Sequence, residues 1–165
     1  MKPCRHFYSS SPDETLRFAA EFAGSLQQGD CIALEGNLGA GKTQFVKGIA
    51  EGLGFGDPDQ VKSPTFVLLH VYPARLRVYH LDCYRLRSGK ELGDLGFDEF
   101  SRDPQGVTCI EWADRVRRFL PLPRYEVSLK IVGEKARKIM VRKISEGSRG
   151  RRRVLRGRPK KASKG

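Results

Sequence analysis

The spacing of apolar residues predicts a helix near the start of the chain. Ser11 and Pro12 suit a helix start, because a serine hydroxyl accepts from a free backbone N–H and proline fits the first turn. Apolar residues then recur every three or four positions: Leu16, Ala19, Ala20, Ala23 and Leu26. Gly29 is the expected end of this helix.

Helical and strand-like patterns alternate through the rest of the chain. In order, they predict a strand at 31–35, a helix at 43–53, a hairpin of strands at 66–72 and 76–82, a strand at 107–111, a short helix at 113–119 and a strand pair at 125–132 and 137–144. Residues 88–103 are rich in glycine and acids and predict short helical pieces at most. This interleaving favours an α/β fold around a central sheet.

A phosphate-binding motif lies between the strand at 31–35 and the helix at 43–53. It fits G-x-x-x-x-G-K-[ST] at each fixed position: Gly36, Asn37, Leu38, Gly39, Ala40, Gly41, Lys42 and Thr43. The glycines let successive N–H groups turn inward around phosphate oxygens, and the helix start adds its positive end. Lys42 would reach the terminal phosphates and Thr43 would offer a hydroxyl to Mg²⁺.

Two carboxylates are candidates for holding that metal. Asp82 ends the predicted strand at 76–82, and Glu111 ends the strand at 107–111. The strand before Glu111 is the more apolar, so we expect it beside the strand that enters the phosphate loop. Ser63-Pro64-Thr65 stands where a nucleotide-sensing loop would lie, although a plain proline turn explains it equally well.

Charge divides the chain into two parts. Of the net charge of +12, nine positive charges lie in residues 148–165, which contain no Asp or Glu, leaving +3 for residues 1–147. We therefore expect one P-loop domain at 1–147 and a disordered basic tail at 148–165. The tail is either a solubilising appendage or a nucleic-acid contact, and Arg156-Gly157-Arg158-Pro159 resembles a minor-groove hook.

Several protein classes do not fit this sequence. No apolar run approaches the ~18 residues that a membrane span needs, and residues 1–7 lack the apolar stretch of a secretory signal. The four cysteines, Cys4, Cys31, Cys83 and Cys109, are scattered without a Cys-x-x-Cys pair. We therefore expect a cytoplasmic protein with reduced thiols, without zinc and without a membrane partner.

Four motifs together resemble one protein family. They are the phosphate loop at 36–43, Ser63-Pro64-Thr65-Phe66, the run His80-Leu81-Asp82-Cys83-Tyr84-Arg85-Leu86 and Ile110-Glu111-Trp112. Their order and spacing are similar to those of the TsaE family (formerly YjeE), small bacterial ATPases of tRNA threonylcarbamoyladenosine biosynthesis. The resemblance covers about residues 10–140. It implies a P-loop NTPase fold with a mixed central β-sheet flanked by helices.

The resemblance also implies roles for individual residues in an ATP·Mg²⁺ site. Lys42 matches the phosphate lysine, and Thr43 and Glu111 match the metal ligands. Asp82 matches a second acidic group that binds the metal or positions water, Thr65 a switch-like loop, and Trp112 the aromatic residue after the acid. His80, Tyr84 and Arg85 match the motif without a clear role.

The implied partners are TsaD and TsaB, the pair that transfers the threonylcarbamoyl group to the adenosine beside the tRNA anticodon. In this family ATP hydrolysis resets the transferase between cycles. Three positions depart from the family pattern: Asn37 replaces the usual Asp, Gln44 replaces a common Thr, and Arg137 matches a family arginine only loosely. Asn37 and Gln44 are not fixed P-loop positions, so the expectation of ATP binding stands.

Two other functions remain open from the sequence. A P-loop small-molecule kinase would need a lid with arginines over the phosphates, and residues 88–103 hold Arg102 among five acids. A nucleic-acid-binding adaptor with a vestigial P-loop would rely on the basic tail instead.

Overall fold

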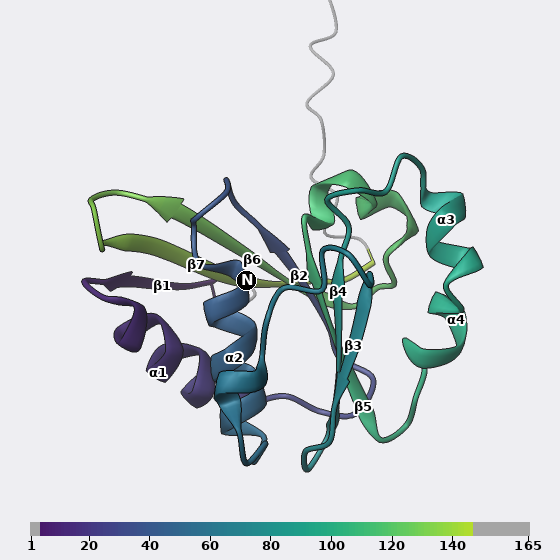
Figure 1. Cartoon of the computed structure of the whole chain (residues 1–165), viewed down its shortest axis with the longest axis horizontal. Helices are drawn as coiled ribbons and strands as arrows, with labels where there is room; N and C mark the ends of the chain where they lie inside the picture. Colours follow the sequence, from purple (N-terminus) through teal and green to yellow (C-terminus); the bar gives the residue numbers. More distant parts are fainter. Residues whose placement is uncertain (1–3, 147–165) are drawn as a thin grey trace, which may run out of the picture.

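The computed structural model describes residues 4–146, which form a seven-stranded sheet with helices on both faces (Figure 1). The strands are β1 (Cys4–Ser9), β2 (Cys31–Glu35), β3 (Leu69–Tyr72), β4 (Arg77–Asp82), β5 (Gly106–Glu111), β6 (Arg124–Ile131) and β7 (Arg137–Ile144). The helices are α1 (Pro12–Ala23), α2 (Lys42–Gly52), α3 (Gly89–Asp94) and α4 (Phe97–Phe100), with 3-10 turns at Pro58–Gln60, Ala113–Arg115 and Arg117–Phe119. The predicted mixed α/β fold is confirmed.

The strand order β1-β7-β6-β2-β5-β4-β3 places β2 at the centre of the sheet. β2 runs parallel to both neighbours, β5 and β6, and β4 runs parallel to β5. The carboxyl ends of β2, β4, β5 and β6 therefore meet at one edge, which we call the carboxyl edge. In this register Glu111 lies beside Asp82 of β4 and Leu34 of β2. Ligands of open α/β sheets bind at such an edge.

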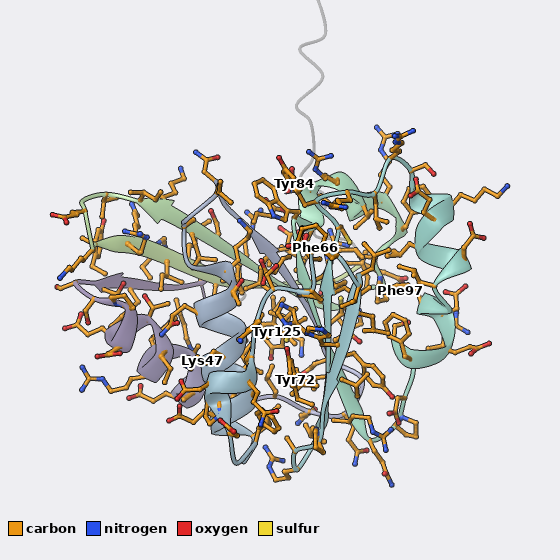
Figure 2. All side chains as sticks on the ribbon, in the orientation of Figure 1. Lys47, Phe66, Tyr72, Tyr84, Phe97 and Tyr125 are labelled. Atoms are coloured by element: carbon orange, nitrogen blue, oxygen red, sulfur yellow. The ribbon has the colours of Figure 1, made fainter. Side chains whose placement is uncertain are left out.

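Helices α1 and α2 cover one face of the sheet and form the larger core. They approach closely because a Cβ at Gly48 or Gly52 of α2 would collide with the backbone of α1. Phe22 of α1 packs against Phe45 of α2 and Tyr125 of β6, and Tyr125 and Tyr72 lie within the body of the protein (Figure 2). This packing holds the start of α2 at the carboxyl edge.

The opposite face is covered over only part of the sheet. Here α3, α4 and the turns at 113–119 bury one apolar cluster, which includes Phe97 (Figure 2). Its buried members are Cys31, Ala33, Leu81, Cys83, Leu86, Leu92, Phe97, Ile110, Ala113, Val116 and Leu120. The strands involved are β2, β4 and β5. The described helices leave β1, β6 and β7 uncovered on this face (Figure 1).

Two predicted helices were wrong in extent. Helix α1 ends at Ala23 rather than near Gly29. The Ser25 and Leu26 N–H groups donate three residues back, to the carbonyl oxygens of Phe22 (3.0 Å) and Ala23 (3.1 Å), so the α-helical pattern of bonds four residues apart stops there. The helix expected at 113–119 is instead a pair of 3-10 turns. Trp112, just before them, has a left-handed backbone (φ 57°) that turns the chain sharply after β5.

The predicted strand at 66–72 begins only at Leu69, since Leu68 has φ 69° and breaks the extended backbone. Strand β1 was not predicted at all. It pairs only with β7 at the edge of the sheet, and most of its side chains are exposed, so its sequence lacks a clear apolar alternation. The basic tail expected at 148–165 lies outside the described residues.

Candidate active site

The phosphate loop lies at the carboxyl edge, between the end of β2 and the start of α2, as the motif predicts. Its path requires glycine at two positions. Gly41 has φ 99°, and a Cβ on Gly36 would lie 2.6 Å from the Leu129 carbonyl oxygen. The turn is closed by the Ala40 N–H, which donates to the Asn37 carbonyl oxygen (3.0 Å). The amino end of α2 therefore faces the loop, which favours an anion there.

Lys42 is buried at the base of this loop, with 5% of its surface exposed. Its Nζ donates to the carbonyl oxygens of Gly36 (2.6 Å) and Asn37 (3.1 Å) and lies 3.9 Å from the centroid of the Trp112 ring. Burial lowers the pKa of Lys42, while the charges of Glu111, Asp82 and Asp114 act in the opposite direction. A phosphate group in the loop would favour the charged ammonium in the same way.

Glu111 connects the end of β5 to the phosphate loop. Its Oε1 accepts hydrogen bonds from the Thr43 hydroxyl (2.7 Å) and from His80 Nε2 (2.8 Å). His80 is fully buried, and its Nδ1 lies 3.5 Å from the Tyr72 hydroxyl. The carboxylate is therefore oriented from two sides before any ligand binds.

Asp82 has a different set of partners. Its Oδ2 accepts from the hydroxyls of Ser63 (2.6 Å) and Thr65 (2.8 Å), and its Oδ1 accepts from the Tyr84 N–H (2.8 Å). Ser63 and Thr65 thus fasten the predicted nucleotide-sensing loop to the end of β4. Glu111 is thus the carboxylate bonded to Thr43 of the phosphate loop, whereas Asp82 is bonded to the loop at 63–65.

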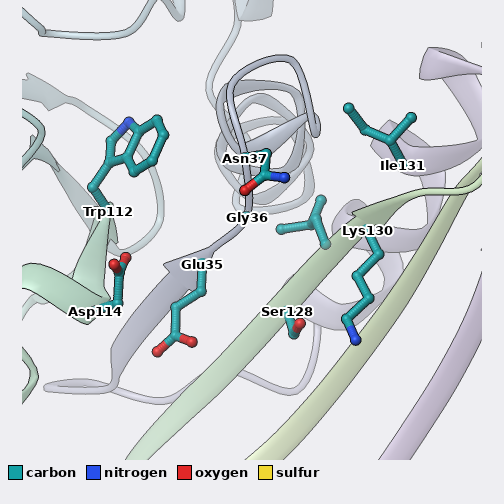
Figure 3. A pocket seen from close by; sticks show the side chains of 9 residues that line it. Glu35, Gly36, Asn37, Trp112, Asp114, Ser128, Lys130 and Ile131 are labelled. Atoms are coloured by element: carbon teal, nitrogen blue, oxygen red, sulfur yellow. The ribbon is translucent and has the colours of Figure 1, made fainter.

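Trp112 separates two clefts at the carboxyl edge. One, of about 410 Å³, contains Lys42, Thr43, Thr65, Asp82 and Glu111 in its walls. The other, of about 510 Å³, lies beyond Trp112, where the indole and Asp114 face Lys130 and Ile131 across the opening (Figure 3). The expected chemistry is therefore gathered in the first cleft, with Trp112 as its wall.

The remaining expected loop residues occupy three kinds of position. Gly39 and Gly41 line the first cleft, with Leu38 at its mouth and 84% exposed, whereas Asn37 faces the second cleft (Figure 3). Ala40 is buried. Arg137 donates to the Gly39 carbonyl oxygen (2.9 Å) and to carbonyl oxygens of the turn at 133–136. These bonds connect the phosphate loop to the turn at 133–136. Arg137 is not in the wall of either cleft.

The residues present suit Mg²⁺ and a phosphate chain. Mg²⁺ prefers oxygen ligands and is usually held by one or two carboxylates together with substrate phosphates. Thr43 Oγ1 and the Glu111 carboxylate supply such oxygens, and Asp82 lies beside Glu111 in the sheet. Within residues 4–146, no three His, Cys, Asp or Glu side chains cluster as a self-sufficient metal site. A metal here would therefore complete its coordination with the nucleotide.

Sequence reasoning did not assign His80 or Ser63 a contact in this site. Both touch the candidate carboxylates, His80 through Glu111 and Ser63 through Asp82. One signal was available: His80 and Asp82 are two residues apart on one strand, so they share a face. The pairing of that face with Glu111 depends on the register between β4 and β5, which the sequence does not reveal.

The four cysteines are free thiols. Burial raises the pKa of Cys31 and Cys83 to about 12, so neither thiol is a reactive nucleophile. No helix in the part of the chain that the structure describes is both long and apolar enough to cross a membrane.

Comparison with known proteins finds relatives that match most of the chain. The family model for the threonylcarbamoyl adenosine biosynthesis protein TsaE matches residues 9–139. The chain is 41% identical over 133 residues to the tRNA threonylcarbamoyladenosine biosynthesis protein TsaE of Treponema pallidum, covering 81% of this chain and 96% of that one. It is 42% identical over 130 residues to the Bacillus subtilis protein of the same name, covering 78% and 79%. The crystal structure of Bacillus subtilis YdiB superposes with a TM-score of 0.71 at 34% identity, covering 88% of each chain.

Proposed function

The chain belongs to the TsaE family of tRNA threonylcarbamoyladenosine biosynthesis proteins, and from this premise we propose that it binds and hydrolyses ATP with Mg²⁺ during that modification. One observation carries the proposal. Lys42, Thr43 and Glu111 come from two different segments and meet in one cleft beside an intact phosphate loop. A buried ammonium and an oriented carboxylate at a helix start are what phosphoryl transfer requires.

Each residue has a distinct part in the proposed reaction. Lys42 and the loop N–H groups bind the phosphates, and Thr43 and Glu111 hold the metal. Bound Mg²⁺ would neutralise charge on the phosphate oxygens. His80 keeps the Glu111 carboxylate turned toward Thr43. Asp82, fastened by Thr65, positions the attacking water at the end of β4.

We further propose that the chain acts with TsaD and TsaB homologues, and that they engage the mouth of this cleft. Three apolar side chains support a contact there: Leu38 is 84% exposed, Phe66 82% and Tyr84 48%. The Arg85 guanidinium lies 4.3 Å from the centroid of the Phe66 ring, and the neighbouring Tyr84 packs against Trp112 (Figure 2). Exposed apolar groups gathered around a site are typical of protein interfaces.

Calorimetry with Lys42→Ala tests the site directly. Removing one buried charge that pairs with phosphate should weaken ATP binding by at least about 30-fold. Lys47→Ala is the matched control, because Lys47 lies on the same helix but pairs with Asp59 (2.5 Å) outside the cleft. Unchanged ATP affinity in a folded Lys42→Ala protein would refute the site. ATP turnover with and without TsaD and TsaB homologues then tests the partnership.

The packing of residues 88–103 weighs against a small-molecule kinase. Leu92 of α3 and Phe97 of α4 are buried in the core, so this segment is not a lid over the phosphates. Screening for a phosphate acceptor separates kinase from ATPase. A nucleic-acid-binding adaptor with a vestigial P-loop would tolerate Lys42→Ala without loss of function. The same variant therefore tests this alternative.

A further inference from the structure

The uncovered face of β1, β6 and β7, which we call the open face, has a defined set of side chains. Directly paired residues of antiparallel strands share one face of a sheet. His6 pairs with Met140, Tyr8 with Lys138, Ser128 with Met140 and Lys130 with Lys138. Val127 and Leu129, on the other face, are buried against α1 and α2. The side chains of the open face therefore point away from both helices.

Most charged side chains of the open face and of the adjoining turn at 117–119 are basic. Lys130, Lys138 and Arg142 lie on the strands, and Arg117 and Arg118 are exposed on the adjoining turn. Glu126 is bonded by Arg124 (2.8 Å) and Arg142 (2.9 Å), and Glu35 is bonded by Arg117. Within residues 4–146, Arg118 and Lys138 have no ion-pair partner. Arg118 is exposed, and Lys138 is half-buried with its ammonium over the Tyr8 ring.

Two clefts lie on this face, at opposite ends of β6. The cleft of about 510 Å³ has Lys130 on one side and the carboxylates of Glu35 and Asp114 on the other (Figure 3). The cleft of about 610 Å³ is the more basic one, because four arginines line it beside two glutamates: Arg117, Arg118, Arg124, Arg142, Glu126 and Glu146. Arg124 is 7% exposed, and its Nε is the one buried side-chain nitrogen or oxygen of the described residues that lacks a hydrogen-bond partner. The exposed guanidinium groups of Arg118 and Arg142 lie in the wall of the same cleft, and such arginines suit an anionic ligand.

We propose that the open face binds the phosphate backbone of RNA. Arginine in a cleft recognises phosphate through several donors at once, and the lysines extend the positive surface along the strands. Tyr8 is 62% exposed, and the Lys138 ammonium lies 5.5 Å from the centroid of its ring. An exposed aromatic side chain beside a cation on a sheet suits an unpaired base and its phosphate. A chain of phosphates that runs from the cleft of about 610 Å³ along the strands to Lys130 and Lys138 would match this charge better than a single free anion.

The place where the described chain ends supports this partner. Glu146 is the last described residue, and it lines the cleft of about 610 Å³. The sequence that follows is strongly basic, since residues 148–165 contain nine Lys or Arg and no acid. The inference does not depend on ATP hydrolysis, because Arg118 and Lys138, the residues that the test removes, lie outside the cleft that contains Lys42 and Glu111.

Filter binding of an unmodified tRNA transcript to the full chain at several salt concentrations tests the proposal. The variant Arg118→Ala/Lys138→Ala removes two open-face charges that make no ion pair among the described residues. The control Arg17→Ala/Lys90→Ala removes two exposed charges from α1 and α3. The open-face variant should lower the slope of log affinity against log salt by up to about 2, because each phosphate contact contributes roughly 0.7–0.9.

Three results would overturn the proposal: no binding of tRNA by the wild-type chain, equal slopes for the open-face variant and the wild type, or an equal loss in the control. Weakened binding of an acidic protein partner with unchanged tRNA binding would also overturn it and assign the face to that protein. Excess free ATP should not displace the tRNA, whereas displacement would identify a site for free phosphate. Calorimetry should give the same ATP affinity for all three proteins, so the outcome is separable from the proposed ATPase.

Discussion

Two buried glutamates, one in each half of the sheet, have opposite surroundings. Glu111 on β5 is 3% exposed and accepts from a hydroxyl and an imidazole. Glu126 on β6 is 8% exposed and accepts from the guanidinium groups of Arg124 and Arg142. Glu126 is already matched by two cations, whereas no lysine or arginine among residues 4–146 bonds Glu111 directly. A buried carboxylate that has no cationic partner, such as that of Glu111, has room for a divalent cation.

The difference follows from how each half of the sheet is covered. Around Glu111 both faces are packed, so its neighbours His80 and Thr43 are fixed in place by the core and by α2. Around Glu126 one face is not covered by the described helices, so the half-exposed Arg142 reaches the carboxylate from the solvent side, while the buried Arg124 bonds it from the same strand. The covered half thus holds a rigid site, and the open half presents a charged surface.

Of the substitutions that test this difference between the two glutamates, Glu111→Gln should have the largest effect on ATP hydrolysis. Glutamine preserves the size of the side chain but removes the charge that holds the metal. We expect at least a 100-fold loss of Mg²⁺-dependent ATP hydrolysis, with binding of metal-free ATP retained or improved because a negative charge near the phosphates is gone. Steady-state turnover and calorimetry in EDTA measure the two quantities. Full turnover in Glu111→Gln would assign the metal to Asp82.

His80→Gln should give the next largest loss. The imidazole contacts Glu111 rather than the nucleotide, so it acts as a positioning residue. Removal of such a partner usually costs 10- to 100-fold in metal affinity or activity. We expect a higher Mg²⁺ concentration for half-maximal turnover, with ATP affinity in EDTA unchanged. A fall in turnover at every Mg²⁺ concentration, without that shift, would contradict the positioning role.

The contrast between the two glutamates shows what the sequence can and cannot predict. The phosphate loop, Asp82 and Glu111 can be predicted from local patterns, because each directly follows an apolar run that predicts a strand. His80 and Ser63 do not, because their contacts depend on strand register and on a loop folded back over β4. Strand β1 is missed for a related reason: its partner β7 lies more than 120 residues later, and its own sequence is that of an exposed edge.

Glu126→Gln should change stability instead of turnover. The two guanidinium groups hold the pKa of Glu126 below its usual value, although burial alone would raise it. Because the folded pKa is the lower one, the stabilisation is present above the unfolded pKa of about 4.3 and disappears as pH falls through the folded pKa. We expect a loss of roughly 1–3 kcal/mol at pH 7. Urea unfolding of both proteins should show this difference shrinking below about pH 4.

Removal of residues 147–165 should have the smallest effect on the nucleotide site. Every strand and helix of the described fold is retained, so ATP affinity should equal that of the full chain. The salt dependence of tRNA binding should become shallower, since nine positive charges are lost. Equal slopes for both proteins would show that this segment does not contact RNA. A sharp preference of the full chain for A·T-rich duplex DNA would instead indicate a minor-groove hook.

The threonylcarbamoyladenosine content of tRNA, measured by mass spectrometry in host cells lacking this chain, tests the central claim most directly. Cells would be complemented with the wild-type chain, Glu111→Gln or Glu126→Gln at equal protein levels. We predict that the wild type and Glu126→Gln restore the modified nucleoside, whereas Glu111→Gln does not. Restoration by Glu111→Gln would contradict the account, because the modification would then proceed without metal-dependent ATP hydrolysis at this edge of the sheet.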